Sequence, residues 1–265
     1  TFSGKVIEAS DFKWDVAVNY SRNRNKVIAL AEGLTTYTLQ ERRGLTSIAR
    51  VGMAYGSLFG IGFKHAPDGQ IVYANGLPVV ETTPRILGNV QPDWMGGISN
   101  TFTYKKFTLT ALIDAKIGGD IFDEGTGTAR WTGQYAETAV GREEGIIGKG
   151  VMNVGTTENP QYVPNDVIVA TNQLIGYNNP RRYHEAAIFD ASFVKLREVS
   201  FGYNIPKSVL SKLRLQNAKI SVVGRNLAIL FKNTPHIDPE VDRFGANQQG
   251  FAYGELPNSR SVGAN

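Results

Sequence analysis

Long segments in which apolar and polar residues alternate are the main feature of the chain. In residues 12–20, Phe12, Trp14, Val16, Val18 and Tyr20 share one parity, while polar or small residues occupy the other. A period of two residues indicates a β-strand. Its length matches the ~9–11 residues that a tilted strand needs to cross a bilayer, whereas strands of globular proteins have ~5–6 residues. The length therefore favours a strand of a membrane barrel.

Four further segments show a similar alternation. A two-residue turn at Lys105-Lys106 joins the first two of them into a hairpin. In the third, the apolar parity changes after Leu196, which predicts a β-bulge at Arg197 or Glu198. These four segments are residues 94–104, 107–117, 193–204 and 218–227.

A short helix is predicted between the last two strands. Pro206 can occupy its first position, and Val209, Leu210 and Leu213 would lie on one of its sides. The other connections are very unequal, because roughly seventy residues separate the strand ending at Tyr20 from the next one, and a similar number follow Ile117. Short periplasmic turns and long extracellular loops are typical of outer-membrane barrels.

If the Lys105-Lys106 turn is periplasmic, several aromatic residues lie at the periplasmic end of the strands. They would form part of an interfacial aromatic girdle. The predicted girdle residues are Phe12, Trp14, Phe102, Tyr104, Phe107, Phe201 and Tyr203. From the alternation alone, a soluble sandwich of two packed sheets fits the same strands equally well.

Composition agrees with either interpretation. The 265 residues are 42% hydrophobic and 20% charged, and no run approaches the roughly 18 apolar residues of a membrane-spanning helix. The net charge of +4 is spread along the chain without a basic block, so we expect no nucleic-acid partner. With no cysteine, the chain cannot form disulfides or thiolate metal sites.

Motifs for catalysis are missing from the sequence. His65, His184 and His236 are dispersed singly, and we expect them to be solvated loop residues. The glycine-rich residues 56–62 and 125–130 lack the ending of a phosphate-binding loop and are interpreted as turns. No Gly-x-Ser-x-Gly elbow occurs. We therefore expect no enzymatic activity and no cofactor.

Two sets of residues are weaker candidates for binding. Carboxylates that follow the strand ending at Ile117 could hold a hard cation, but their spacing lacks a ligand-loop pattern and favours a solvated loop. Aromatic residues of the long loops could contact a ligand or pack against one another. The carboxylate candidates are Asp120, Asp123 and Glu124, close to Asp114 in the sequence, and the aromatic ones are Trp131, Tyr135, Tyr162 and Tyr177.

Six segments, in order along the chain, look like landmarks of one family. They are residues 11–27, 69–78, 87–104, 116–122, 191–206 and 218–227. The chain resembles the C-terminal third of a SusC/RagA-like, TonB-linked (TonB-dependent) outer-membrane transporter. The resemblance implies an all-β fold, an antiparallel transmembrane β-barrel segment of a 22-strand barrel with long extracellular loops. Residues 1–265 would form a C-terminal portion that lacks the plug domain, the N-terminal barrel strands and the closing strand.

The resemblance also implies a function for the intact protein. It would import glycans, peptides or similar nutrients across the bacterial outer membrane, in contact with outer-membrane lipid. A SusD-like lipoprotein would cover it, and the TonB system would act through parts outside this chain. Two alternatives stay open: a SusC-like scaffold within an outer-membrane assembly, and a soluble, secreted β-sandwich that binds carbohydrate.

Overall fold

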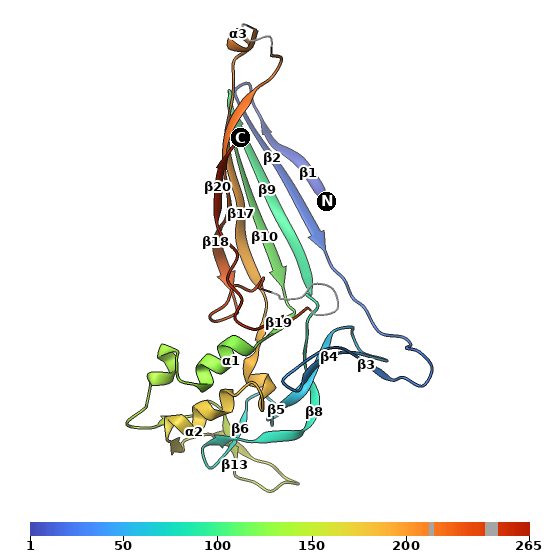
Figure 1. Ribbon diagram of the computed structural model, residues 1–265, viewed down its shortest axis with the longest axis vertical. Coiled ribbons are helices and arrows are strands. Elements are labelled where there is room, and N and C mark those ends of the chain that lie inside the picture. The colour runs from blue at the N-terminus through green and yellow to red at the C-terminus, as the bar shows by residue number, and fades with distance from the viewer. Residues whose placement is uncertain (212–214, 242–248) are drawn as a thin grey trace.

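A large antiparallel sheet forms one half of the computed structural model, which describes residues 1–211, 215–241 and 249–265 (Figure 1). Neighbouring strands follow the order β1-β2-β9-β10-β17-β18-β20. The strands are β1 (Phe2–Glu8), β2 (Phe12–Ser21), β9 (Trp94–Tyr104), β10 (Phe107–Ile117), β17 (Phe193–Asn204), β18 (Lys219–Lys232) and β20 (Ser261–Ala264). The five central strands are 10 to 14 residues long, enough to cross a bilayer at a tilt.

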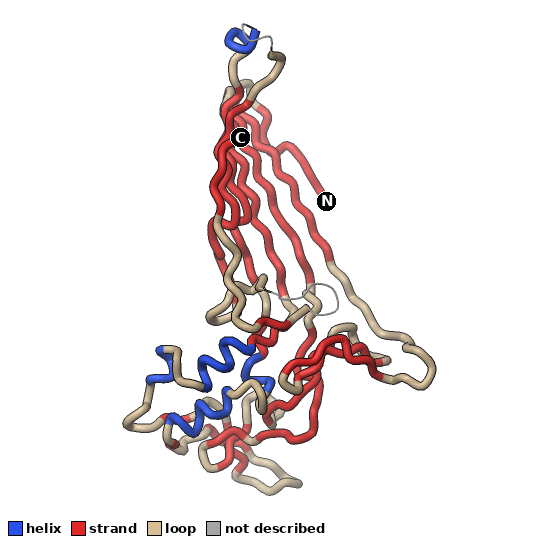
Figure 2. Tube along the Cα trace, in the orientation of Figure 1, coloured by secondary structure: helices blue, strands red, loops and turns tan. Residues whose placement is uncertain are grey.

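The sheet is a single layer. In the described part of the chain no second sheet lies over either of its faces (Figure 2). A β-sandwich would bury one face beneath another sheet at about 10 Å, so the sandwich alternative is not supported. The two outer strands, β1 and β20, are not paired with each other. The predicted fold class, an antiparallel barrel segment, is confirmed.

Most strand predictions are confirmed, with small differences in length. β9, β10 and β17 have the predicted bounds, whereas β18 continues five residues beyond Leu227. The consecutive residues Leu112 and Ile113 of β10 pair with Glu198 and Leu196, so Arg197 between them is the extra residue and the predicted bulge lies there. The edge strands β1 and β20 were not predicted, because β20 has only four residues and the alternation of β1 is interrupted at Val6, where its register shifts.

The predicted short helix is α3 (Lys207–Leu210), whose N-cap is Pro206, so the helix begins one residue later than expected. Leu210 is buried, whereas Val209 is about half exposed. Leu213 lies outside the described residues.

The two long connections fold together at one end of the sheet into what we call the loop layer (Figure 1). The first connection contains β3 (Thr36–Arg42), β4 (Leu45–Arg50), β5 (Ser57–Phe63), β6 (Val72–Ala74), β7 (Leu77–Pro78) and β8 (Val80–Asn89). The second begins with β11 (Asp120–Asp123), α1 (Glu124–Trp131), η1 (Ala136–Ala139), β12 (Ile146–Ile147), β13 (Val151–Asn153) and β14 (Tyr162–Pro164). It ends with β15 (Ile168–Val169), α2 (Thr171–Ile175), η2 (Gly176–Asn178), η3 (His184–Ala187) and β16 (Ile188–Asp190). β19 (Phe251–Ala252) pairs with β11 and adds a third part of the chain.

The main hydrophobic core lies in this layer and joins all three parts. Leu45 and Leu58 come from the first connection, Phe122 and Ala187 from the second, and Phe251 from β19. The rings of Phe122 and Phe251 meet edge to face at 6.0 Å. Within the described residues every helix is too short or too polar to span a membrane. The loop layer therefore has a core of its own, while the large sheet has none.

The glycine-rich segments are not turns, so that prediction is wrong. Residues 125–130 lie in helix α1, and residues 57–62 lie in strand β5. A Cβ atom on Gly127 would lie 2.9 Å from the Cβ of Ala187, and one on Gly60 would lie 2.7 Å from Nδ1 of His184. These glycines allow close packing inside the loop layer, which local sequence cannot reveal.

Candidate functional site

The pairing register gives the large sheet one apolar and one polar face. Trp14, Phe102, Leu109, Phe201 and Val222 are successive cross-strand partners on the apolar face. One residue further along, the row on the opposite face is Asp15, Thr101, Thr110, Ser200 and Val223. Because a strand period of two separates the faces, the sheet can present one side to lipid and the other to water.

The seven predicted girdle residues lie together at the end of the sheet that carries the Lys105-Lys106 turn. They occupy two adjacent cross-strand rows of the apolar face. Ring centroids are 5.6 Å apart for Trp14 and Phe102, and 5.0 Å apart for Phe107 and Tyr203. Tyr104, Phe107 and Phe201 are exposed. The sequence thus identified a real aromatic cluster, whose contact with a membrane interface stays a prediction.

A second aromatic pair lies at the opposite end of the same face. The rings of Tyr20 and Trp94 are 5.9 Å apart, and Tyr20 is exposed. From Phe12 to Tyr20 the strand rises about 26 Å at ~3.3 Å per residue, close to the height of an outer-membrane apolar band of about 25 Å. Sequence reasoning missed this pair because its members lie on different strands, far apart in the chain.

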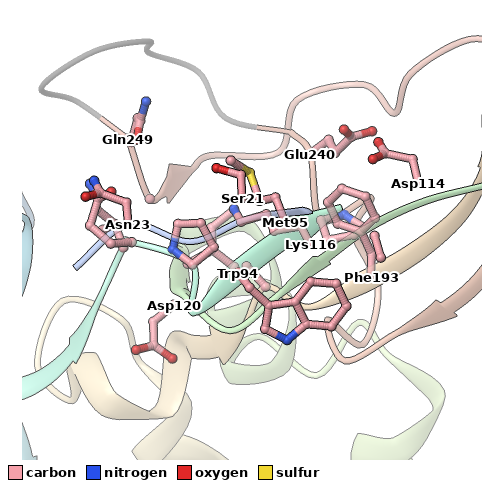
Figure 3. A pocket seen from close by; sticks show the side chains of 18 residues that line it. Ser21, Asn23, Trp94, Met95, Asp114, Lys116, Asp120, Phe193, Glu240 and Gln249 are labelled. Carbon is pink, nitrogen blue, oxygen red and sulfur yellow. The ribbon is translucent and has the colours of Figure 1, made fainter. Parts of the chain in front are cut away.

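A cavity of about 480 Å³ opens where the large sheet meets the loop layer (Figure 3). Met95, Lys116 and Phe193 come from the ends of β9, β10 and β17, Asp120 is the first residue of β11, and Glu240 follows β18. Its wall is therefore mixed, with apolar rings and methionine beside carboxylates, an amine and the amides of Asn23 and Gln249. A cavity of this size can hold a small polar ligand.

An ionic network joins the sheet to the segment beside this cavity. Lys195, whose side chain is only 4% exposed, has its Nζ 2.6 Å from Oδ1 of Asp238 and 2.5 Å from Oε2 of Glu240. Arg197, at the bulge, contacts Glu240 at 2.8 Å and Asp114 at 2.5 Å. Burial raises the pKa of Glu240, but its hydrogen bonds to Arg197 and Lys195 outweigh burial and lower that pKa overall. The network fixes residues 238–240 over the polar face.

The expectation of solvated loop histidines is wrong for His184 and for His65, which is half-buried in an isolated β-bridge, whereas His236 is an exposed loop residue. His184 is buried; its Nδ1 accepts a hydrogen bond from the Ile61 N–H at 2.9 Å, and its Nε2 lies 2.9 Å from the Arg43 carbonyl oxygen. The neighbouring Glu185 contacts His65 at 3.0 Å and Arg85 at 2.9 Å. These contacts tie the two long connections together, across a hundred or more residues of sequence.

Acidification is expected to loosen the loop layer through His184. Burial lowers its pKa from the ordinary value of 6.5, so the folded state holds the neutral ring. The unfolded chain binds the proton first as pH falls below 6.5, so the free energy of unfolding falls as the pH is lowered in that range. Thermal unfolding of the intact protein between pH 8 and pH 5 should show this slope, and a His184→Gln variant should flatten it. An equal slope in both proteins would assign the effect to another group.

Of the candidate carboxylates, Asp123 and Glu124 are buried and Asp120 is half-buried, and each has a partner within the loop layer. Asp123 is the N-cap of α1 and accepts a hydrogen bond from the Thr126 N–H at 3.0 Å, while burial raises its pKa. Asp120 accepts a hydrogen bond from the Asn89 N–H at 2.8 Å, and its pKa is also raised by burial. Glu124 lies 2.6 Å from Arg42 and 2.8 Å from Arg43. Within the described residues, no three acidic or histidine side chains are grouped as a metal site.

The loop aromatics fall into three different environments. Trp131 and Tyr177 line one open pocket, together with Tyr183. Tyr135 stacks on His236, with ring centroids 3.7 Å apart. Tyr162 packs against a small core around Val72. The structure therefore brings two of the four predicted ligand-binding residues together and separates the other two.

The chain is similar in sequence to TonB-dependent receptors. No protein-family profile matches the chain. The chain is 28% identical, over 98% of its length, to TonB-dependent receptor P3 of Formosa agariphila, and 24% identical, over 97%, to TonB-dependent receptor P26 of the same organism. It is similar to one section of a TonB-dependent receptor. The chain spans 27% of the length of each of these two relatives, and the resemblance inferred from the sequence is confirmed.

Solved structures agree with the similarity to TonB-dependent receptors. The RagAB peptide importer in its closed-closed state superimposes with a TM-score of 0.62 at 19% identity, over 99% of this chain and 28% of that chain. The open-open state gives the same TM-score at 18% identity. These likenesses establish a shared fold. TonB-dependent receptors are outer-membrane proteins, so the predicted outer-membrane location is confirmed.

Proposed function

We propose that the chain forms part of the barrel wall and outer loops of a TonB-dependent importer of nutrients. The single-layered sheet is the observation that carries the proposal. Its central strands have membrane-spanning length, its apolar face has aromatic residues at both ends, and its other face is polar. Such a sheet is stable only when lipid covers the apolar face and further strands pair with β1 and β20.

The proposed role requires no chemical step from these residues. The polar face would line the passage, and the loop layer would meet nutrients such as glycans or peptides together with a SusD-like lipoprotein. Energy would come from the TonB system through other parts of the protein. The seven-residue girdle would lie at the periplasmic interface, and Trp131, Tyr135, Tyr162 and Tyr177 would lie on the outer side.

Growth on defined nutrients tests the proposal. A strain that lacks the intact protein should lose growth on at least one glycan or peptide source, and the wild-type gene should restore it. Uptake of that nutrient should stop when a protonophore removes the proton gradient. If the purified protein is a closed barrel but its loss changes the uptake of no nutrient, the importer proposal fails and a scaffold role replaces it.

A further inference from the structure

An open pocket of about 650 Å³ lies in the loop layer, within the second long connection. It is formed where the end of α1 meets α2, η2 and the residues that follow η2. The lining residues are Trp131, Gln173, Gly176, Tyr177, Asn179, Arg181, Arg182 and Tyr183. This volume is within the range of pockets that bind small molecules.

The floor of the pocket is a stack of aromatic rings attached to the core. Tyr177 and Tyr183 stack at 4.9 Å with an angle of 20° between their planes. Tyr183 in turn stacks on the buried Phe63 at 6.0 Å. The next residue, His184, is held by both of its ring nitrogens. The floor is therefore fixed before any ligand binds, which lowers the entropy cost of binding.

Two arginines carry unbalanced positive charge at this pocket. Arg181 and Arg182 are exposed, and within the described residues neither guanidinium forms an ion pair. Arg42 and Arg43, by contrast, both pair with Glu124. The turn that carries Arg181 and Arg182 is ordered, because the Tyr183 N–H donates to the Asn179 carbonyl oxygen at 2.9 Å. A guanidinium group can donate two parallel hydrogen bonds to the oxygens of one carboxylate or sulfate, so the two arginines suit an anionic ligand.

The remaining lining indicates a sugar as the carrier of that anion. Trp131 is 37% exposed, and a flat indole face suits the apolar face of a sugar ring. The amides of Gln173 and Asn179 offer both donors and acceptors, as hydroxyl groups require. The residues that line the pocket include no aliphatic side chain, and a peptide would need such contacts or a free strand edge.

We propose that this pocket binds an acidic sugar residue, one that carries a carboxylate or a sulfate group, with Arg181 and Arg182 binding the anion. The inference rests on the proposed function, because the pocket must open to the outside medium to meet such a ligand. Binding itself requires no import and can be measured on the purified protein.

Isothermal titration of the intact protein in detergent tests the pocket. The probes are tetragalacturonate, its fully methyl-esterified form, a sulfated carrageenan tetrasaccharide and a tetraglutamate peptide. Tetragalacturonate or the sulfated tetrasaccharide should bind, and the one that binds identifies the anion as carboxylate or sulfate. The uncharged ester should bind at least about tenfold more weakly than tetragalacturonate if carboxylate is the anion.

Variants assign the binding to named residues. The double variant Arg181→Gln, Arg182→Gln and the single variant Trp131→Ala should each raise the Kd at least about tenfold. Arg24→Gln removes an equal charge from an exposed residue outside the pocket and should leave the Kd within about twofold. Unchanged binding in the double variant, binding of none of the probes, or tighter binding of tetraglutamate than of either acidic sugar would overturn the assignment.

The binding experiment and the growth experiment test the two proposals independently. If a probe binds but nutrient uptake is unchanged in the strain that lacks the protein, the importer proposal fails and the pocket stands. If that strain loses uptake of a nutrient but no probe binds, the pocket proposal fails and the importer stands.

Discussion

Val199→Arg is expected to destabilise the intact protein by about 2–4 kcal/mol in a lipid bilayer. Val199 pairs with Ala111 and Gly224 in the middle row of the apolar face, between the two aromatic ends. A guanidinium at the centre of the hydrocarbon has no water and no partner, and this cost falls to about 0–1 kcal/mol near the interfaces. Urea titration of the protein folded into phosphatidylcholine vesicles measures the change in the free energy of unfolding.

Thr110→Arg is the matched control for that measurement. Thr110 lies next to Ala111 on β10 but on the polar face, in the same cross-strand row as Asp15. Its arginine would meet water and a nearby carboxylate, so we expect a change below about 1 kcal/mol. Equal destabilisation by the two substitutions would mean that the sheet does not separate lipid from water, against the proposed barrel wall.

Lys195→Met is expected to cost about 3–5 kcal/mol and to release the segment beside the cavity. The substitution leaves Asp238 buried without its cation, and Glu240 keeps only Arg197. When one partner of a buried ion pair is removed, the other charge stays buried with neither water nor a counter-charge, which strongly destabilises the folded state. Hydrogen exchange should rise across residues 237–241, and urea titration should show the loss of stability.

Arg225→Gln provides the comparison for the lysine variant. Glu198 lies on β17, as Lys195 does, and forms an ion pair at 2.8 Å with Arg225 of β18, but the arginine side chain is 63% exposed. Exposed pairs contribute about 0–1 kcal/mol, so hydrogen exchange at residues 237–241 should not change. A similar effect of both variants would show that burial does not strengthen the network around Lys195.

The membrane-spanning strands were predictable because each carries its own signal. The alternation from Phe12 to Tyr20 reports which residues share a face, and the parity change after Leu196 predicts a bulge at Arg197 or Glu198, which the pairing with β10 places at Arg197. Edge strands such as β20 carry no such signal, since four residues are too few for a period to be recognised.

The loop layer was predicted poorly for a definite physical reason. His184 and Gly60 were interpreted from their sequence neighbours as a solvated residue and a turn residue, but each is set by a distant contact. His184 receives its hydrogen bond from Ile61, and Gly60 is small because that imidazole packs against it. Such pairs leave no local pattern in the sequence.

The sequence by itself determined the strands, their two faces and the aromatic cluster at the turn end, because strand geometry is local and repeats every two residues. Only the tertiary structure decided which side chains meet: the network around Lys195, the cavity beside it and the pocket between Trp131 and Arg182. These sites join residues that are tens of positions apart, and their partners are chosen by the packing of the loops rather than by any periodic pattern.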